Sequence, residues 1–330
     1  FIESLVIGHV VLKNIGNFDD KKVRKYIEDS IQKVKLNKYS NFYAVGGSFR
    51  ALAKLHMHIK SEDLKIIQDY KVDSAEFLHE LRTRIFVNKN TVDEKFLSQL
   101  FKSRIKSIPY TFHVLEMLVQ KMSIKKIFFT NTGVREGVLY DLVKDKGVDP
   151  FLSQIRKIAR GTIKKRNAEK LFSWILPFND ILKMDQNLLL SACWLTNIAS
   201  PLHPEHRRIF ALEKILYHQF FHLDRQNRIM LALILYFRYS NNLKENFALS
   251  YSEKIKKKNL IKVKILGQLL RMAHHITGRL NYNNLDHCKL TINSINKVNF
   301  KAKKTYLLFG QSFERGIKNI SNAFESLKRN

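Results

Sequence analysis

The hydrophobic pattern of the chain changes near residue 150, and this change limits the folds that it can adopt. Before that point, short apolar segments such as 42–45 and 126–130 alternate with stretches of helical period, which is typical of an α/β lobe. After Gly147-Val148-Asp149-Pro150 the period is helical almost throughout. We therefore expect an α/β part over 1–148 and an all-α part over 149–285.

Individual elements follow from the same periodicity. In the first part it predicts strands at 4–12, 42–45 and 126–130, and helices at 21–34, 49–59, 73–86, 93–104, 109–122 and 135–143. In the second it predicts helices at 151–165, 167–176, 185–198, 204–220, 225–240 and 260–279. The pattern changes again near the end, with strands at 290–292 and 305–309 and a helix whose apolar face carries Phe313, Ile317, Ile320, Phe324 and Leu327. We expect 286–330 to form a small α/β tail.

Composition excludes several classes of protein. With 45% hydrophobic residues the chain can bury a core, and its longest apolar run, 229–237, is too short to cross a bilayer. The two cysteines, Cys193 and Cys288, lie far apart, so neither a disulfide framework nor a zinc ribbon is expected. No secretion signal precedes the first part, which favours the cytoplasm. The sequence begins at Phe1 inside a predicted strand, and we expect it to be an N-terminally truncated piece of a longer protein.

The chain carries a large positive charge. Its 58 Lys and Arg residues face 29 Asp and Glu residues, which gives a formal net charge of +29. Most of this surplus, +21, falls on residues 151–330, and +8 falls on 1–150. Such a surplus favours a polyanionic partner such as nucleic acid, polyphosphate, a nucleotide or an anionic membrane. The alternative is genomic bias, because Lys, Asn, Ile and Phe are abundant while there are only 12 Gly and 5 Pro.

Two junctions between a strand, a glycine and a helix are candidate phosphate sites. The first carries Gly46, Gly47, Ser48 and Arg50, and the second carries Gly133, Arg135, Glu136 and Gly137. Glycine lets a phosphate approach the backbone, and the start of a helix supplies unpaired N–H groups. An arginine one turn later can add a bidentate contact. Turns of this kind are also common in folds that bind nothing. For Glu136 we favour a carboxylate that caps the helix start over a catalytic group.

Other polar clusters in the second part give weaker indications. Its histidines, His203, His206, His218, His222, His274 and His275, have no closely spaced acidic partners, so we do not expect a metal site. The basic runs 164–166 and 256–258 are interpreted as solvated helix faces that could also line a track for a polyanion.

The motifs resemble those of one known family. YAVGGSFRALAKL (43–55) and TGVREGVLYDLV (132–143) are similar to two motifs of the exopolyphosphatase/guanosine pentaphosphate phosphohydrolase (Ppx/GppA) family, in the same order. SLVIGHVVL (4–12) resembles a further family segment. ACWLTNIASPLHPEHR (192–207) resembles a segment of the helical domain of alphaproteobacterial exopolyphosphatases. The resemblance covers nearly the whole chain.

The resemblance implies a fold and an activity. The fold would be the second lobe of an actin/Hsp70-like (ribonuclease H-like) ATPase fold, followed by an HD-like helical domain and the small α/β tail. The activity would be the Mg²⁺-dependent removal of terminal orthophosphate from inorganic polyphosphate by a cytoplasmic homodimer. The two glycine junctions would line the cleft and bind phosphate. The family's catalytic Glu and two further glycine loops are expected upstream of Phe1, so we expect this piece to be inactive alone.

The sequence departs from the family pattern at two places. Val11 stands where relatives carry Arg, and Asn197 stands where relatives keep Asp, with Thr196 before it in place of His. An HD-like metal site needs carboxylate or imidazole ligands, so we expect none there. We expect the helical domain to be a basic scaffold and dimer surface.

Two alternative functions remain open. One is the sister activity, the removal of the 5′-γ-phosphate from guanosine pentaphosphate (pppGpp). The other is a non-catalytic basic module that binds polyphosphate or RNA. An RNA-binding protein should expose aromatic residues between its basic ones, whereas Phe and Tyr here fall mostly on apolar helix faces. Nucleic acid and membranes are therefore not the expected partners.

Overall fold

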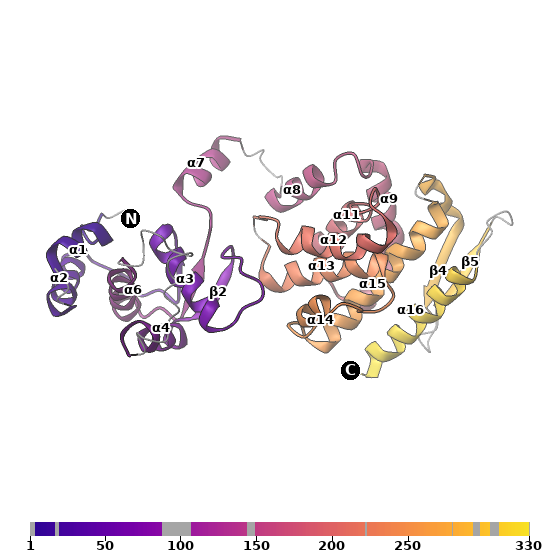
Figure 1. Cartoon of the computed structure of the whole chain (residues 1–330). Coiled ribbons are helices and arrows are strands. Elements are labelled where there is room, and N and C mark those ends of the chain that lie inside the picture. The colour runs from indigo at the N-terminus through magenta and orange to yellow at the C-terminus, as the bar shows by residue number, and fades with distance from the viewer. Residues whose placement is uncertain are drawn as a thin grey trace. The chain divides into compact units, whose positions relative to one another are not determined.

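The chain forms two compact units, Phe1–Lys144 (unit 1) and Asp145–Asn330 (unit 2). The computed structural model describes residues 4–16, 20–87, 107–143, 149–221, 223–278, 280–292, 298–303 and 310–329. Both units are mostly helical, and each contains one small sheet (Figure 1). The predicted division of the second part at residue 286 stays a prediction.

Unit 1 is built on a three-stranded sheet in the order β1-β3-β2. β1 (Asn41–Ala44) runs parallel to β3 (Lys126–Phe129), and β2 (Tyr70–Asp73) is antiparallel to β3. The helices are α1 (His9–Gly16), α2 (Asp20–Gln32), α3 (Gly47–Ile59), α4 (Ser74–Arg82, continued by a π turn to Val87), α6 (Ile108–Met122) and α7 (Val134–Val143). Most predicted helices of this part are confirmed. The helix predicted at 93–104 lies outside the described residues.

The strand predicted at 4–12 is wrong. Residues 4–8 pair with no strand among the described residues, and the chain then enters α1 at His9. Leu12 is fully buried against α2 and α6, whereas Val6 and Val10 are 64% and 60% exposed. β-branched residues favour a strand only where a neighbouring strand can pair with them. Packing against other helices therefore decides the structure of this segment.

Helix α6 has two apolar faces and serves two separate cores. Phe112 and Leu115 pack in the main core with residues of the sheet, α3 and α4. Tyr110 and Val114 pack with Leu12 and the apolar side of α2. A helix that is apolar nearly all round is stable only when it is covered on all sides. The position of α6 therefore fixes α1 and α2 relative to the sheet.

A buried carboxylate also joins three helices of unit 1. Glu116 of α6 is 4% exposed and lies 3.3 Å from the guanidinium of Arg24 on α2. The guanidinium of Arg82, from α4, contacts the other carboxylate oxygen. Removing one partner of a buried ion pair leaves a charge without compensation, which is strongly destabilising. Glu116 therefore links α2, α4 and α6 as well as filling space between them.

Unit 2 is a helical bundle centred on α13. Its helices are α8 (Pro150–Ile158), α9 (Lys165–Ile175), α10 (Asn179–Leu182), α11 (Gln186–Leu195), α12 (Pro204–Leu216), α13 (Arg225–Tyr239), α14 (Asn246–Ser252) and α15 (Lys257–Thr277). The predicted helices are confirmed in position, but two of them end early. The first ends at Ile158 because the chain turns at Gly161, where φ is +81°, and the one predicted at 204–220 ends at Leu216. The short helices α10 and α14 were not predicted. The apolar run 229–237 is entirely buried in α13.

Two buried polar side chains of unit 2 bind the ends of neighbouring helices. Arg228 is fully buried, and its Nη1 donates to Ile215 O (3.2 Å) and Leu216 O (3.4 Å) at the end of α12. Gln268 of α15 donates to Phe237 O (3.3 Å) and Ser240 O (3.0 Å) at the end of α13. The last carbonyl groups of a helix have no partner within it. These bonds satisfy them and fix how the helices pack.

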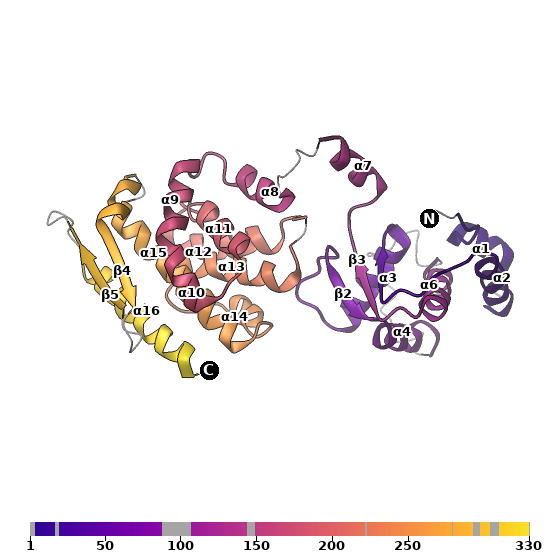
Figure 2. The same ribbon diagram turned by 180° about the vertical axis from the view of Figure 1, so that it is seen from behind.

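The end of the chain packs on the bundle as part of unit 2. β4 (Cys288–Ile292) and β5 (Val298–Ala302) form an antiparallel pair, and α16 (Gln311–Arg329) lies along it (Figure 2). α16 also packs on α15, and Phe324 stacks on Phe178 with ring centroids 6.1 Å apart. The apolar face predicted for α16 is buried at Phe313, Ile320, Phe324 and Leu327. The predicted strand 290–292 falls within β4, β5 was not predicted, and 305–309 lies outside the described residues.

Two further observations concern the membrane and the thiols. Among the helices of the described residues, none has both the length and the apolar content needed to cross a bilayer. Cys193 and Cys288 are both free and buried. Burial raises the pKa of the Cys193 thiol well above its usual range, so this thiol is unreactive.

Gly267 provides a test of the packing between α13 and α15. A Cβ atom at Gly267 would lie 2.5 Å from Phe237 Cβ and 2.7 Å from Ile234 O. We expect Gly267→Ala to lower the free energy of unfolding by about 1–3 kcal/mol in urea denaturation, although alanine favours helices. Gly137→Ala in α7, where a Cβ meets nothing within 4 Å, is the control and should not lower it. Equal effects of the two changes would contradict this packing.

His56 provides a test of pH dependence. Its ring is 3% exposed, with Nδ1 2.7 Å from Tyr70 OH and Nε2 3.0 Å from the Glu80 carboxylate. Burial lowers the pKa of His56 and outweighs Glu80, because Lys60 binds the same carboxylate at 2.8 Å. The unfolded chain therefore takes up a proton near pH 6.5 that the folded chain does not bind.

The free energy of unfolding should accordingly decrease as pH falls below about 6.5. The free energy of unfolding, measured in urea between pH 7.5 and 5.5, should fall less steeply for His56→Gln than for the natural chain. His79→Gln, which removes an exposed ring from α4, is the control and should leave the slope unchanged. A slope that His56→Gln does not alter would refute this role of His56.

Candidate functional site

The parallel pairing of β1 and β3 brings the two glycine junctions together. In the register of this pair Ala44 lies opposite Phe129, so both strands end at the same edge of the sheet. β1 leads through Gly46 into α3, and β3 leads through Gly133 into α7. The starts of both helices therefore lie at one edge, and the positive ends of their dipoles lie close together.

A cavity of about 290 Å³ lies between these two helix starts. Five of the eight predicted residues line it: Gly46, Arg50, Gly133, Arg135 and Glu136. Gly47, Ser48 and Gly137 are not among its lining residues. Sequence reasoning missed Val45, Asn131, Thr132 and Val134, which also line it. Three of them lie directly next to a predicted junction residue and Asn131 lies two positions before Gly133, which is the signal that could have found them.

Gly46 is required by its backbone conformation. Its φ of +110° and ψ of 163° lie in a region that is essentially restricted to glycine. Gly46 O accepts from Arg50 N at 3.0 Å, which closes the first turn of α3. A Cβ at Gly46 would meet nothing within 4 Å. Glycine is therefore needed at this position for the backbone angles that lead the chain into the helix, and not for lack of space. The space beside its Cα stays open to a ligand.

Arg50 connects the two junctions. From the first turn of α3 its Nη1 donates to Asn131 O, at 3.4 Å, in the loop after β3. This contact holds the partly buried guanidinium at the wall of the cavity. Arg135 is exposed at the start of α7 and lines the same cavity. Two arginines therefore line one small space, where guanidinium groups can bind an anion through several N–H groups.

Glu136 caps the start of α7. Its Oε2 accepts from Gly133 N at 2.7 Å, the geometry of a carboxylate three residues after the N-cap. This bond, more than the neighbouring Arg135 and Arg50, lowers the pKa of Glu136. A carboxylate with a lowered pKa is a weak general base. The interpretation of Glu136 as a structural cap is confirmed by this bond.

The loop after β3 is held by a side chain that the motifs did not indicate. Gln68, which is 8% exposed, accepts from Asn131 N and Thr130 Oγ1, both at 3.0 Å. Thr130 Oγ1 in turn accepts from Thr132 N at 3.1 Å. These bonds fix the backbone that leads into Gly133. Gln68 is therefore a positioning residue for the cavity, and it lies too far from both motifs in the sequence to be found there.

The groups around the cavity suit a phosphate better than a cation. Glu136 is the single carboxylate among its described lining residues, and Gly133 N–H already occupies one of its oxygens. Mg²⁺ prefers several oxygen ligands. The described residues therefore do not form a Mg²⁺ site by themselves, and Mg²⁺ stays a prediction from the resemblance.

The histidines of unit 2 do not assemble a cluster in the part of the chain that is described. The rings of His203 and His206 lie 6.1 Å apart, and His222 lies outside the described residues. No three His, Cys, Asp or Glu side chains of the described ranges come close enough to hold a metal ion.

Gly46 gives a direct test of this geometry. Gly46→Ala should lower the free energy of unfolding by about 1–3 kcal/mol, because alanine is strained at φ +110°. Gly8→Ala is the control, since that position has no positive φ and open space around its Cα. Urea denaturation measures both. If Gly46→Ala is as stable as Gly8→Ala, the conformation described for the junction is wrong.

Comparisons with known families match both units. Residues 1–146 match the Ppx/GppA phosphatase family, and residues 182–311 match the exopolyphosphatase C-terminal domain. No curated protein matches the chain. The matched family domains imply an actin-like ATPase fold followed by a C-terminal domain, with which the two mostly helical units and their small sheets are consistent. The chain therefore belongs to the Ppx/GppA phosphatase family.

Proposed function

We propose that this protein is an exopolyphosphatase whose unit 1 cavity binds the terminal phosphates of inorganic polyphosphate. The observation that carries the proposal is the meeting of two helix starts and two arginines, Arg50 and Arg135, around one space. Helix starts and guanidinium groups are the usual partners of phosphate in proteins. The family consists of phosphatases, which supports hydrolysis of the bound substrate.

In the proposed reaction a water molecule attacks the terminal phosphorus atom. The bond from that phosphorus to the bridging oxygen breaks, orthophosphate leaves, and the shortened chain keeps the bridging oxygen. Negative charge on the transferred group and the leaving oxygen must be stabilised during this step. Arg50, Arg135 and the backbone N–H groups at the starts of α3 and α7 would supply that stabilisation. Glu136 is not the base, because its carboxylate caps α7.

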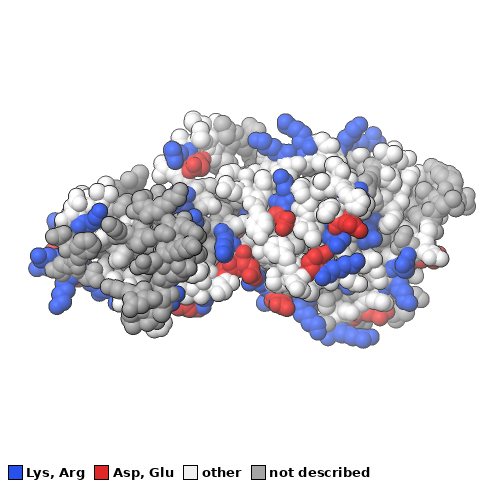
Figure 3. All heavy atoms as spheres, in the orientation of Figure 1, with Lys and Arg blue, Asp and Glu red and all other residues white. Residues whose placement is uncertain are grey.

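A long polymer suits the charge of the chain better than a nucleotide does. Residues 151–330 carry a net charge of +21. On the face shown in Figure 3, Lys and Arg side chains are spread over the surface, with acidic side chains between them. A spread of positive charge attracts an extended anion and weakens with salt. Hydrolysis of the 5′-γ-phosphate of pppGpp remains the second candidate, since both activities occur in this family.

Binding to the cavity can be tested with Arg50. We expect the natural chain to bind tripolyphosphate in isothermal titration calorimetry, and Arg50→Ala to bind it about tenfold more weakly, because a charge-assisted hydrogen bond is lost. Lys54→Ala is the control. It removes one positive charge from an exposed position one turn further along α3, outside the cavity. If Arg50→Ala and Lys54→Ala bind tripolyphosphate equally well, the cavity is not the phosphate site.

Turnover, measured on the protein in its natural length, decides between the candidate substrates. Incubation with long-chain polyphosphate and Mg²⁺ should release orthophosphate progressively, and cleavage of pppGpp alone would favour the second candidate. Binding without any turnover would favour the non-catalytic module. The 330 residues alone should bind polyphosphate without hydrolysing it, because two glycine loops that the resemblance assigns to catalysis do not occur among them.

The remaining properties implied by the resemblance are part of the proposal. They are a homodimer, a cytoplasmic location and a requirement for Mg²⁺. Sedimentation of the protein in its natural length would show the oligomeric state. Loss of orthophosphate release on addition of a chelator, restored by Mg²⁺, would show the metal requirement.

A further inference from the structure

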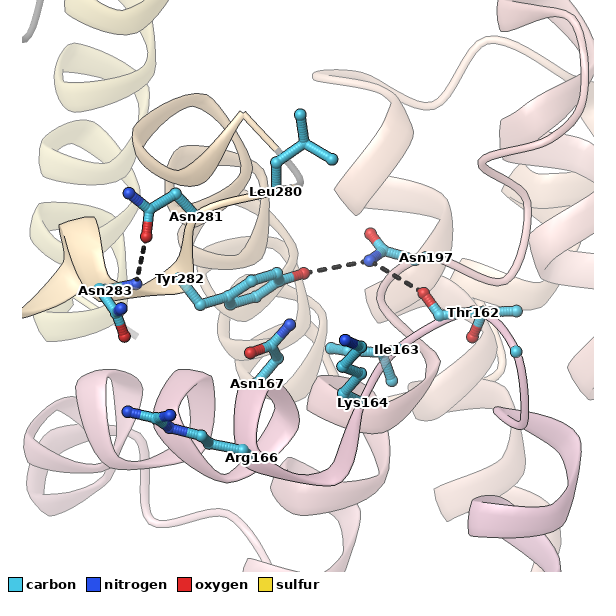
Figure 4. Close-up of a pocket in the computed structure, with 11 residues that line it drawn as sticks. Thr162, Ile163, Lys164, Arg166, Asn167, Asn197, Leu280, Asn281, Tyr282 and Asn283 are labelled. Atoms are coloured by element: carbon cyan, nitrogen blue, oxygen red, sulfur yellow. Dashed lines mark hydrogen bonds between the residues drawn. The ribbon is translucent and has the colours of Figure 1, made fainter.

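Unit 2 contains a second cavity, remote in sequence from the glycine junctions. It has a volume of about 640 Å³ and lies between the start of α9, the buried residue Asn197 and the segment that follows α15 (Figure 4). This volume falls within the roughly 300–1,000 Å³ of typical small-molecule sites. It is much larger than a single phosphate group needs.

The charges at this cavity favour an anion. Lys164 and Arg166 line it, and no acidic residue is among its described lining residues. Lys164 is the N-cap residue of α9, a helix of 11 residues, and makes no capping bond with its side chain. The first N–H groups of a helix have no partner within the helix, and its dipole favours negative charge at this end. A phosphate group fits this corner of the cavity.

Asn197 gives a second and independent indication of a ligand, because one of its polar atoms needs a hydrogen-bond donor. It is 6% exposed, and its Nδ2 donates to Tyr282 OH at 3.0 Å and to Thr162 O at 3.4 Å. Because a carbonyl oxygen can only accept, the bond to Thr162 fixes which atom of the amide is nitrogen. Oδ1 is then a buried acceptor, and it has no hydrogen-bond partner among the described residues.

A buried acceptor without a donor is unfavourable, and a bound group can remove that cost. The partner of Asn197 Oδ1 must carry an N–H or O–H group. The inner units of polyphosphate have only acceptor oxygens, so they do not satisfy it. Tyr282 adds a complementary group, because its hydroxyl accepts from Asn197 and can donate its own proton to a ligand oxygen.

We propose that this cavity is a binding site for a nucleotide. The phosphates lie at Lys164, Arg166 and the start of α9, and a donor on the base or the sugar bonds to Asn197 Oδ1. This site goes beyond the proposed exopolyphosphatase function and does not depend on it. It requires no metal, since its side chains are cationic or neutral.

The site is tested by calorimetric titration of the intact chain with GDP, ADP and tripolyphosphate. The nucleotides carry phosphates together with N–H and O–H donors. Tripolyphosphate carries phosphates only, and at high pH, where it is deprotonated, it has no hydrogen-bond donor. The Arg50→Ala chain is used so that the unit 1 cavity contributes little to binding. We expect this chain to bind GDP or ADP at least about threefold more tightly than it binds tripolyphosphate, which is the gain expected for one satisfied hydrogen bond. Equal affinities would show a site for phosphate only and would overturn the assignment of a nucleotide.

A pair of variants locates the binding. The double change Lys164→Ala with Arg166→Ala should weaken binding of the nucleotide about tenfold, through the loss of charge-assisted bonds. Lys165→Ala is the control, because Lys165 is an exposed neighbour that does not line the cavity. A double variant that binds within twofold of the control would refute the site.

The same titrations separate this site from the cavity of unit 1. If Arg50→Ala abolishes binding of GDP and ADP while the double variant does not, the nucleotide binds in unit 1 and this proposal is wrong, although the proposed function can still hold. If Arg50→Ala weakens only tripolyphosphate, both sites stand. If no nucleotide binds at concentrations up to millimolar, the nucleotide site in unit 2 is refuted, and the proposed exopolyphosphatase function is unaffected.

Discussion

The parallel pairing of β1 with β3 is the constraint on which the unit 1 cavity depends. Parallel strands end at the same edge of a sheet, so the loops that follow them lie close together. In this chain each loop begins a helix, and the register of Ala44 with Phe129 brings Gly46 near Gly133. An antiparallel pairing would place the two junctions at opposite edges. The direction of one strand therefore decides whether two separate motifs make one site.

The sequence predicted the parts of the fold that local pattern determines. Helices such as α12 and α13 follow from apolar periodicity, and the glycine junctions follow from residue type and spacing. The segment 4–12 shows where this fails, because Leu12 packs on helices from elsewhere in the chain. Gln68 shows the same for the site, since its bonds to Thr130 and Asn131 join distant residues. Contacts between distant segments depend on the whole fold, and local pattern does not contain them.

The two cavities favour an anion in the same way, although different neutral residues line them. Each lies at the start of a helix and has two cationic side chains, Arg50 and Arg135 in one and Lys164 and Arg166 in the other. They differ in their neutral groups. Two glycines and one amide residue, Asn131, line the unit 1 cavity, whereas four amide residues line the unit 2 cavity: Asn167, Asn197, Asn281 and Asn283. At Asn197 the resemblance implies Asp. Replacing a carboxylate by an amide removes a negative charge, and a position suited to a cation becomes compatible with an anion.

The two cores that share α6 have a consequence for the order in which unit 1 is made. Residues of α1 and α2 leave the ribosome well before Tyr110 and Val114, the α6 residues that complete their core. The apolar sides of α1 and α2 must therefore stay uncovered during synthesis until α6 follows. The same holds for β1, whose only described partner strand is β3. Unit 1 can thus become stable only when its synthesis is nearly complete, and the nascent chain exposes apolar surface until then.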